Sequence, residues 1–289
     1  MNIRKSKIIY ISLLVALIAV PALSQGLNWE GQTGAFITPF AYTSGSEAGK
    51  VGKPQIAFHY LNAGAVVGDS VQASITVGMF KRAEFGYTRT IKMDGDSAAL
   101  SPLFKGGFNT FHGKLNVVSE NLNKSKWVPA ISVGFVARTQ VKRVGGVIGN
   151  KEETSGDLYV VATKTITQVK GLPFLLSGGL KATNSSVFGV AGSAPDWTGR
   201  AFGAAAIVVK GPAKSTLIFG SEFAQQPHKI KGLAGATVPT SLTYFVRILP
   251  GEKYPFNLDF GVAQVVGKIM PGVDLKARHQ FAMGMSYKF

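Results

Sequence analysis

The last ten residues of the chain alternate strictly between large apolar side chains and small or polar ones. The apolar positions are Phe281, Met283, Met285, Tyr287 and Phe289, and the residues between them are Ala, Gly, Ser and Lys. Because successive side chains of a β-strand point to opposite faces, this alternation predicts a strand with one apolar face. An apolar face opposite a small or polar one is typical of a membrane β-barrel, where one face contacts lipid and the other the lumen.

The same alternation recurs along the chain in runs close to the 9–11 residues that a tilted membrane-spanning strand needs. None of these runs has a convincing helical period. Clear runs lie at 55–61, 71–78, 111–117, 130–138, 241–248, 256–263 and 280–289, and weaker or ambiguous ones near 83–91, 157–166, 173–183, 201–210 and 215–223. We therefore predict an all-β, antiparallel transmembrane β-barrel of twelve strands within residues 54–289.

The connections between the runs alternate in length. Long connections lie at 92–109, 139–156, 184–200, 224–240 and 266–278, and shorter ones at 79–82, 119–127, 167–172, 211–214 and 249–255. Outer-membrane barrels have short periplasmic turns and long external loops, whereas a soluble sandwich has no reason to sort its loops in this way. The loop lengths therefore favour a barrel in the outer membrane of a Gram-negative cell.

Residues 25–53 precede the predicted barrel and are open to two interpretations. They could supply two more strands and make a barrel of fourteen. However, Pro39 lies at the centre of the run 36–42, and proline is poorly tolerated in a paired strand. We therefore expect 25–53 to form an N-terminal segment that lies in the periplasm or in the lumen.

The first 24 residues have the pattern of a signal peptide. Arg4, Lys5 and Lys7 precede an apolar run of 13 residues, Ile8 to Val20, which is too short to span a bilayer. A small-x-small cleavage site, Ala22-Leu23-Ser24, follows it. A permanent N-terminal anchor is the alternative, and the length of the run argues against it. No long uncharged apolar run follows residue 24, which excludes a transmembrane helix there.

Three motifs resemble an uncharacterised family of proteobacterial outer-membrane β-barrel proteins known only as a domain of unknown function. The first runs from Asn28 to Gly34 (NWEGQTG) and is followed by Pro39 and Ala41-Tyr42. The others are 58–64 (FHYLNAG) and 84–89 (EFGYTR). The resemblance covers most of the chain after residue 24. It implies a barrel in the outer membrane, and it implies no substrate and no catalytic residue.

The sequence lacks the motifs of catalysis and metal binding. The chain has no Cys and only four His, and it contains neither Gly-x-Ser-x-Gly nor His-x-x-x-His. His59 and His112 fall at lumen positions of their strands, where a polar side chain is expected. We therefore predict no enzymatic activity, no cofactor and no metal site, and a barrel hydrolase is disfavoured.

Charged residues at lumen positions are the candidate functional residues. Six are basic and three are acidic: Arg82, Lys114, Arg138, Lys181, Arg247 and Lys288, with Glu84, Glu222 and Asp259. An excess of basic side chains in a pore favours anions. Because Gly284 and Ser286 fall at lumen positions, we also expect a lysine there to be tolerated better than an arginine at Phe281 or Met285 on the lipid face.

We therefore expect a narrow porin-like channel or transport-associated barrel for small solutes, with anions as one option. The alternative is a plugged, non-conducting barrel with a structural or binding role. The expected partners are outer-membrane lipid, lipopolysaccharide and the barrel assembly machinery, which would bind the C-terminal strand ending at Phe289. Nucleic acid is not expected, because the basic residues of this chain, whose net charge is +16, are scattered.

The mature protein should begin at Gln25 and fractionate with the outer membrane. A closed barrel has no strand edge at which to fray, so unheated protein should migrate differently from heated protein in a denaturing gel. Recovery of the mature chain in the soluble periplasmic fraction would contradict this prediction.

Overall fold

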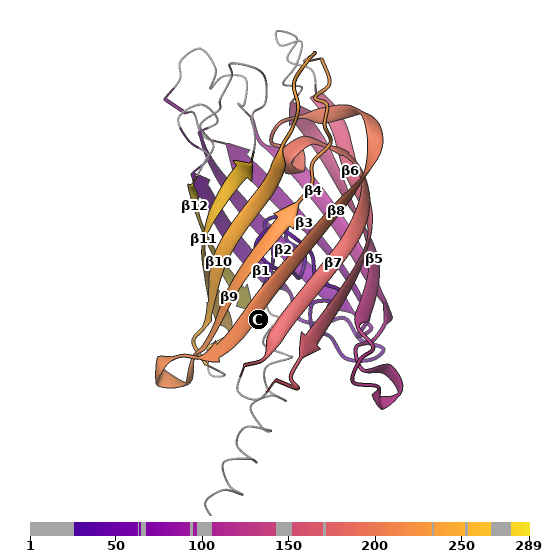
Figure 1. Ribbon diagram of the computed structural model, residues 1–289, viewed down its shortest axis with the longest axis vertical. Helices are drawn as coiled ribbons and strands as arrows, with labels where there is room; N and C mark the ends of the chain where they lie inside the picture. Colours follow the sequence, from indigo (N-terminus) through magenta and orange to yellow (C-terminus); the bar gives the residue numbers. More distant parts are fainter. Residues whose placement is uncertain are drawn as a thin grey trace, which may run out of the picture.

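The computed structural model describes residues 26–62, 64, 68–92, 95–96, 106–142, 152–169, 172–232, 234–251, 254–266 and 279–289. The proposed signal peptide lies outside these residues. Twelve antiparallel strands form one closed barrel (Figure 1). The strands are β1 (Gln55–Asn62), β2 (Asp69–Met79), β3 (Ala83–Lys92), β4 (Phe108–Val118), β5 (Ala130–Lys142), β6 (Glu152–Ile166), β7 (Phe174–Ser185), β8 (Ser193–Lys210), β9 (Thr216–Ala224), β10 (Thr240–Leu249), β11 (Phe256–Val266) and β12 (Gln280–Lys288).

The barrel closes through its first and last strands. Each strand pairs with its neighbours in sequence, and β12 also pairs with β1, so that Met285 lies opposite Phe58. The prediction of twelve strands is confirmed, and the alternative of fourteen is wrong. Between residues 26 and 54 the described chain forms only isolated bridges, such as that between Gly34 and Pro39. No described helix is long and apolar enough to cross a membrane.

The outer face of the barrel is apolar, as the alternation predicted. On β12, Met283 and Met285 are 43% and 44% exposed, whereas Ala282 is fully buried. The same holds on β1, where Phe58 points outward and His59 inward. A continuous band of exposed apolar side chains needs lipid around it, and the chain is therefore a barrel of the Gram-negative outer membrane.

The short turns gather at one end of the barrel, the lower end in Figure 1. The tightest joins β2 to β3, and its residues Phe80 and Lys81 have φ angles of 54° and 65°. Two positive φ angles are typical of the hairpin turn that matches strand twist, although Asn-Gly would adopt them at lower cost. Here the N-terminal segment supports the turn: Phe80 N donates to Lys50 O at 2.8 Å, and Lys81 N to Ser46 Oγ at 2.8 Å.

The lumen is filled by the chain that precedes β1. All residues from Gly26 to Thr38 are buried, and this segment lies inside the barrel (Figure 1). Its apolar side chains, including Trp29, Phe36 and Phe40, belong to one buried cluster with inward residues of the wall. Among these wall residues are Tyr159, Phe202 and Phe245. The core of this barrel is therefore built between the wall and the N-terminal segment.

This filling removes the basis of one expectation. A lysine at Gly284 or Ser286 was expected to be tolerated better than a charge on the lipid face, because both positions face the lumen. A Cβ atom at Gly284 would instead lie 2.5 Å from the His59 ring, and Ser286 is itself buried, with its hydroxyl accepting the amide of Leu27 at 3.4 Å. Large side chains at these positions would displace the N-terminal segment.

Replacing Met285 with Arg should reduce the free energy of unfolding by about 2–4 kcal/mol, because the charge would face lipid near the middle of β12. Replacing Phe80 with Arg is the control, since Phe80 is exposed in a periplasmic turn. Denaturant titration in lipid vesicles measures both. Equal destabilisation by the two variants would show that the outer face of β12 does not contact lipid.

Candidate functional site in the lumen

We call the buried segment from Gly26 to Ser44 the plug. The barrel wall contacts it largely through the peptide groups of the plug rather than through its side chains. Neutral side chains supply several of these contacts: Thr163 accepts the amide of Ala41 at 2.8 Å, and Ser132 donates to Ala41 O at 2.5 Å. Charged residues of the wall supply the rest, in four groups.

The first group is Glu222 of β9, which accepts hydrogen bonds from the tip of the plug. Its Oε1 accepts the amides of Phe36 at 3.0 Å and Ile37 at 2.7 Å. Its Oε2 accepts the amide and the hydroxyl of Thr38, both at 2.8 Å. A carboxylate offers about four acceptor positions, so these donors saturate it. Three consecutive amides that would otherwise be unsatisfied in the lumen are satisfied by one side chain.

The second group is the ion pair of Glu84 (β3) with Lys114 (β4), 2.9 Å apart and without exposed side-chain surface. Glu84 accepts the amide and hydroxyl of Thr33 at 3.1 and 2.7 Å, and the amide of Ser44 at 2.8 Å. Lys114 Nζ donates to Thr33 O at 2.8 Å. One ion pair therefore fixes two points of the plug that are distant along the chain.

The third group is the pair of Arg247 (β10) with Asp259 (β11). Arg247 Nε donates to Asp259 Oδ1 at 2.7 Å and its second terminal nitrogen to Oδ2 at 3.0 Å, which is a bidentate pair. The remaining guanidinium donors reach Gly34 O at 2.9 Å and Ala35 O at 3.1 Å. The planar guanidinium thus binds a carboxylate on the wall and two carbonyls of the plug.

The fourth group includes the single charged side chain of the plug, Glu30. Arg138 Nε (β5) donates to Glu30 Oε1 at 2.6 Å, and a terminal nitrogen of Arg138 donates to Asp157 Oδ2 (β6) at 2.8 Å. Lys181 Nζ (β7) lies 3.7 Å from the same oxygen of Asp157 and 5.0 Å from the ring centre of Phe188. Burial raises the pKa of the Glu30 carboxyl above its usual value, and the Arg138 guanidinium acts in the opposite direction.

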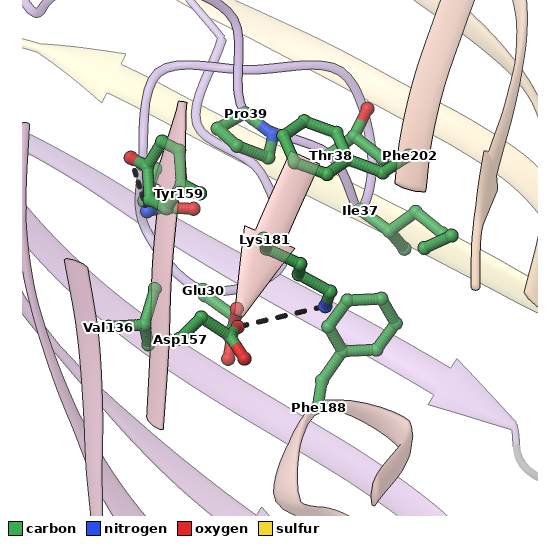
Figure 2. Close-up of a pocket in the computed structure, with 12 residues that line it drawn as sticks. Glu30, Ile37, Thr38, Pro39, Val136, Asp157, Tyr159, Lys181, Phe188 and Phe202 are labelled. Atoms are coloured by element: carbon green, nitrogen blue, oxygen red, sulfur yellow. Dashed lines mark hydrogen bonds and ion pairs between the residues drawn. The ribbon is translucent and has the colours of Figure 1, made fainter. Parts of the chain in front are cut away.

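A cavity of about 20 Å³ adjoins this fourth group (Figure 2). Glu30, Asp157 and Lys181 lie on one side of it and the plug residues Ile37 and Pro39 on the other. This volume holds about one water molecule. In the state described, the cavity is therefore too small for a transported solute.

External segments cover the end of the lumen opposite the short turns. The short helix η4 (Ser186–Gly189) places Phe188 at the cavity, and Val187 N donates to Gln226 Oε1 at 3.0 Å. Val187 also packs on a small apolar cluster of Ile230, Ala236 and Val238. Lys231 forms an ion pair with Glu153 at 3.2 Å.

The periplasmic end of the plug is fixed by Tyr42. Its hydroxyl lies 2.9 Å from Glu120 Oε2 and 2.8 Å from Thr165 Oγ1. Burial, with a smaller effect of the Glu120 carboxylate, raises the pKa of Tyr42, which keeps the phenol protonated and able to donate.

Seven of the nine candidate lumen residues are buried inside the barrel: Glu84, Lys114, Arg138, Lys181, Glu222, Arg247 and Asp259. Lys288 is partly buried beside Gly45 at the periplasmic end. Arg82 is exposed, because it lies in the turn after β2, where strand parity no longer applies. Sequence reasoning missed Glu30 and Asp157.

The charge balance of the lumen also differs from the one expected. Among the described strand residues, the buried basic side chains are Lys114, Arg138, Lys181 and Arg247, and the buried acidic ones are Glu84, Asp157, Glu222 and Asp259. Four charges of each sign give no overall positive excess in this buried layer. The argument from total charge for an anion preference is therefore lost.

Replacing Glu222 with Gln should loosen the tip of the plug. Gln has one acceptor oxygen in place of two, so its NH2 group would face either the amides of Phe36 and Ile37 or the two donors of Thr38, and each buried unsatisfied donor costs about 1–3 kcal/mol. The thermal midpoint at which the barrel loses its gel-shifted form should fall. Glu47, which is exposed beside Lys50, provides the matched Glu47→Gln control. An unchanged midpoint for Glu222→Gln would show that these hydrogen bonds do not hold the plug.

Comparison with known proteins places this geometry in a known fold. The COG4313 outer membrane channel from Pseudomonas putida F1 matches with a TM-score of 0.50 and 12% identity, over 88% of this chain and 100% of that chain. The KdgM porin matches with a TM-score of 0.46 and 9% identity, over 81% of this chain and 99% of that chain. No curated protein matches the sequence significantly. The model of the family "Protein of unknown function (DUF3034)" matches residues 25–249, and the chain belongs to this family.

Proposed function

We propose that this protein is a porin-like outer-membrane barrel for small solutes, and that its own N-terminal plug closes it in the state described. The observation that carries the proposal is the polar character of the inner wall. The buried wall residues include Gln72, Ser74, Thr76, Thr88 and Thr90 in addition to the eight buried charges. The eight charges also hold the plug, but a permanent core could hold it with neutral hydroxyl and amide side chains, as Thr163 and Ser132 do, without the cost of burying charges. A polar inner face is typical of a water-filled channel.

The plug is attached in a way that would let it leave the lumen without opening the barrel. Residues 47–50 are exposed at the periplasmic end, and Gly49 has a φ of 74°. The following residues are fixed: Val51 forms a bridge with Met79, and Gly52 N donates to Gly78 O at 2.8 Å. Movement about 45–50 would release the plug toward the periplasm while β1 keeps its pairing.

A permanently plugged barrel with a structural or binding role is the second candidate. One observation favours it, namely the unbroken burial of residues 26–38 and their many hydrogen bonds to the wall. The two candidates differ in whether the plug ever leaves the lumen. The fold is shared with a protein described as an outer membrane channel, and we extend that class of function to this chain only as part of the proposal.

We also propose two partners that the barrel would meet outside the lumen. Lipopolysaccharide would surround the external end of the apolar band. The barrel assembly machinery would bind β12 and Phe289, which directly follows β12 and is 55% exposed. The proposal includes no catalytic step, and the described residues contain no cluster of His, Asp or Glu able to hold a metal.

Conductance in planar bilayers tests the proposed function. Cysteines at Ala41 and Ser132 would join plug to wall, since Ser132 Oγ lies 2.5 Å from Ala41 O and the chain has no other Cys. We expect a low open probability for the wild type and a higher one for Glu222→Gln. The variant with cysteines at both Ala41 and Ser132 should not open once a short bifunctional thiol reagent has linked the two cysteines. The Ser132→Cys variant alone is the control. If Glu222→Gln conducts no ions, the permanently plugged barrel is the better description.

A further inference from the structure

We infer that Arg138 and Lys181 form the site that binds the carboxylate of the transported solute, and that Glu30 of the plug occupies this site in the closed state. The inference rests on the proposed function and names its substrate class. The solute would be a small monocarboxylate with an apolar body.

The first support is the uniqueness of Glu30. It is the only charged residue between Gly26 and Ser44. The other three charged groups of the wall contact peptide groups and hydroxyls of the plug, which carry no net charge. Only at Arg138 does the plug present an anion to the wall, at 2.6 Å from Arg138 Nε.

The second support is the local charge balance. The wall pairs Lys114–Glu84 and Arg247–Asp259 are neutral without the plug, and Glu222 carries a negative charge. Arg138 and Lys181 share only Asp157, so this group of wall residues carries one net positive charge once Glu30 leaves. A fixed positive charge on the wall of an open lumen attracts an anion. Because Asp157 remains in place, a single negative charge balances the group and a second would be repelled.

The third support is the surroundings of the charges. The cavity beside Lys181 is lined by Tyr159 and Phe202 of the wall and by Phe188 of η4, and the Tyr159 and Phe202 rings meet edge to face at 6.3 Å (Figure 2). Ile37 and Pro39 of the plug fill the space next to these rings. Removing the plug would expose an apolar surface next to the carboxylate site. A solute with a carboxylate on an aliphatic or aromatic body would match both the basic site and the adjacent apolar surface.

The first test removes the carboxylate of Glu30 from the full-length chain. Glu30→Ala leaves a space that acetate fits, and acetate titration should be visible in the fluorescence of the buried neighbour Trp29. Acetamide, which has the same shape without the charge, should bind at least roughly tenfold more weakly, as expected for the loss of a charged hydrogen bond. Adding Arg138→Met should abolish acetate binding, whereas Glu47→Ala should show none. Equal affinity for acetate and acetamide would overturn the inference.

The second test keeps Glu30 and its ion pair with Arg138 in place. A single cysteine at Ala35, which is fully buried in the plug, should react slowly with a maleimide. Benzoate should accelerate the reaction by competing with Glu30, whereas benzamide and chloride at equal concentration should not. The same rate in all three solutions would overturn the inference.

The experiments distinguish a failure of the proposed channel from a failure of the proposed carboxylate site. If benzoate releases the plug but no solute crosses the bilayer, the carboxylate site stands and the transport proposal is wrong. If ions cross through Glu222→Gln and neither test shows dependence on carboxylate, the channel stands and the assignment of its substrate class is wrong.

Discussion

The closed structure depends on hydrogen bonds between charged side chains of the wall and peptide groups of the plug. A peptide segment without regular structure leaves most of its N–H and C=O groups without partners, and burying such groups unpaired is costly. Within the barrel, Glu222, Glu84, Lys114 and Arg247 provide the missing partners. Without them the plug could not lie in the lumen, and the apolar cluster around Trp29 and Phe36 could not form.

The same side chains would serve two states. In the closed state they are saturated by the plug, so their charges and hydrogen-bonding groups are compensated. In an open state they would line a polar lumen and meet water or solute. Arg138 is the clearest example, because it forms one ion pair with Asp157 of the wall and another with Glu30 of the plug. Only the second ion pair would be lost when the plug leaves. Closure is therefore a competition between the plug and water or solute for one set of wall residues.

The sequence predicted the wall well because a strand's alternation is a local property. The outward face of Met285 and the inward direction of Arg138 or Asp259 follow from a period of two residues, and the short turns between successive runs indicated that neighbouring strands pair. Parity fails where a strand ends, and Arg82 was misplaced for that reason. Asp157 was missed because it is the first residue of the run 157–166, where the alternation is too weak to assign a face to each side chain.

The plug could not be predicted in the same way. Its residues follow no period, and their partners are far away in sequence: Thr38 and Glu222 are 184 residues apart. The resemblance of 28–34 to a family motif marked this stretch without giving a role to any residue. One signal was available, a single acidic residue in an otherwise uncharged segment ahead of a barrel rich in basic residues. Its partner, however, is apparent only from the closed fold.

Hydrogen–deuterium exchange of the full-length protein tests the central claim most directly. If Glu222 holds the tip of the plug, the amides of Phe36, Ile37 and Thr38 exchange about as slowly as those of the neighbouring strands. In Glu222→Gln these three amides exchange faster, while the strand amides keep their rates. Rapid exchange of residues 36–38 in the wild type, at the rate of the exposed residues 47–50, would contradict the account.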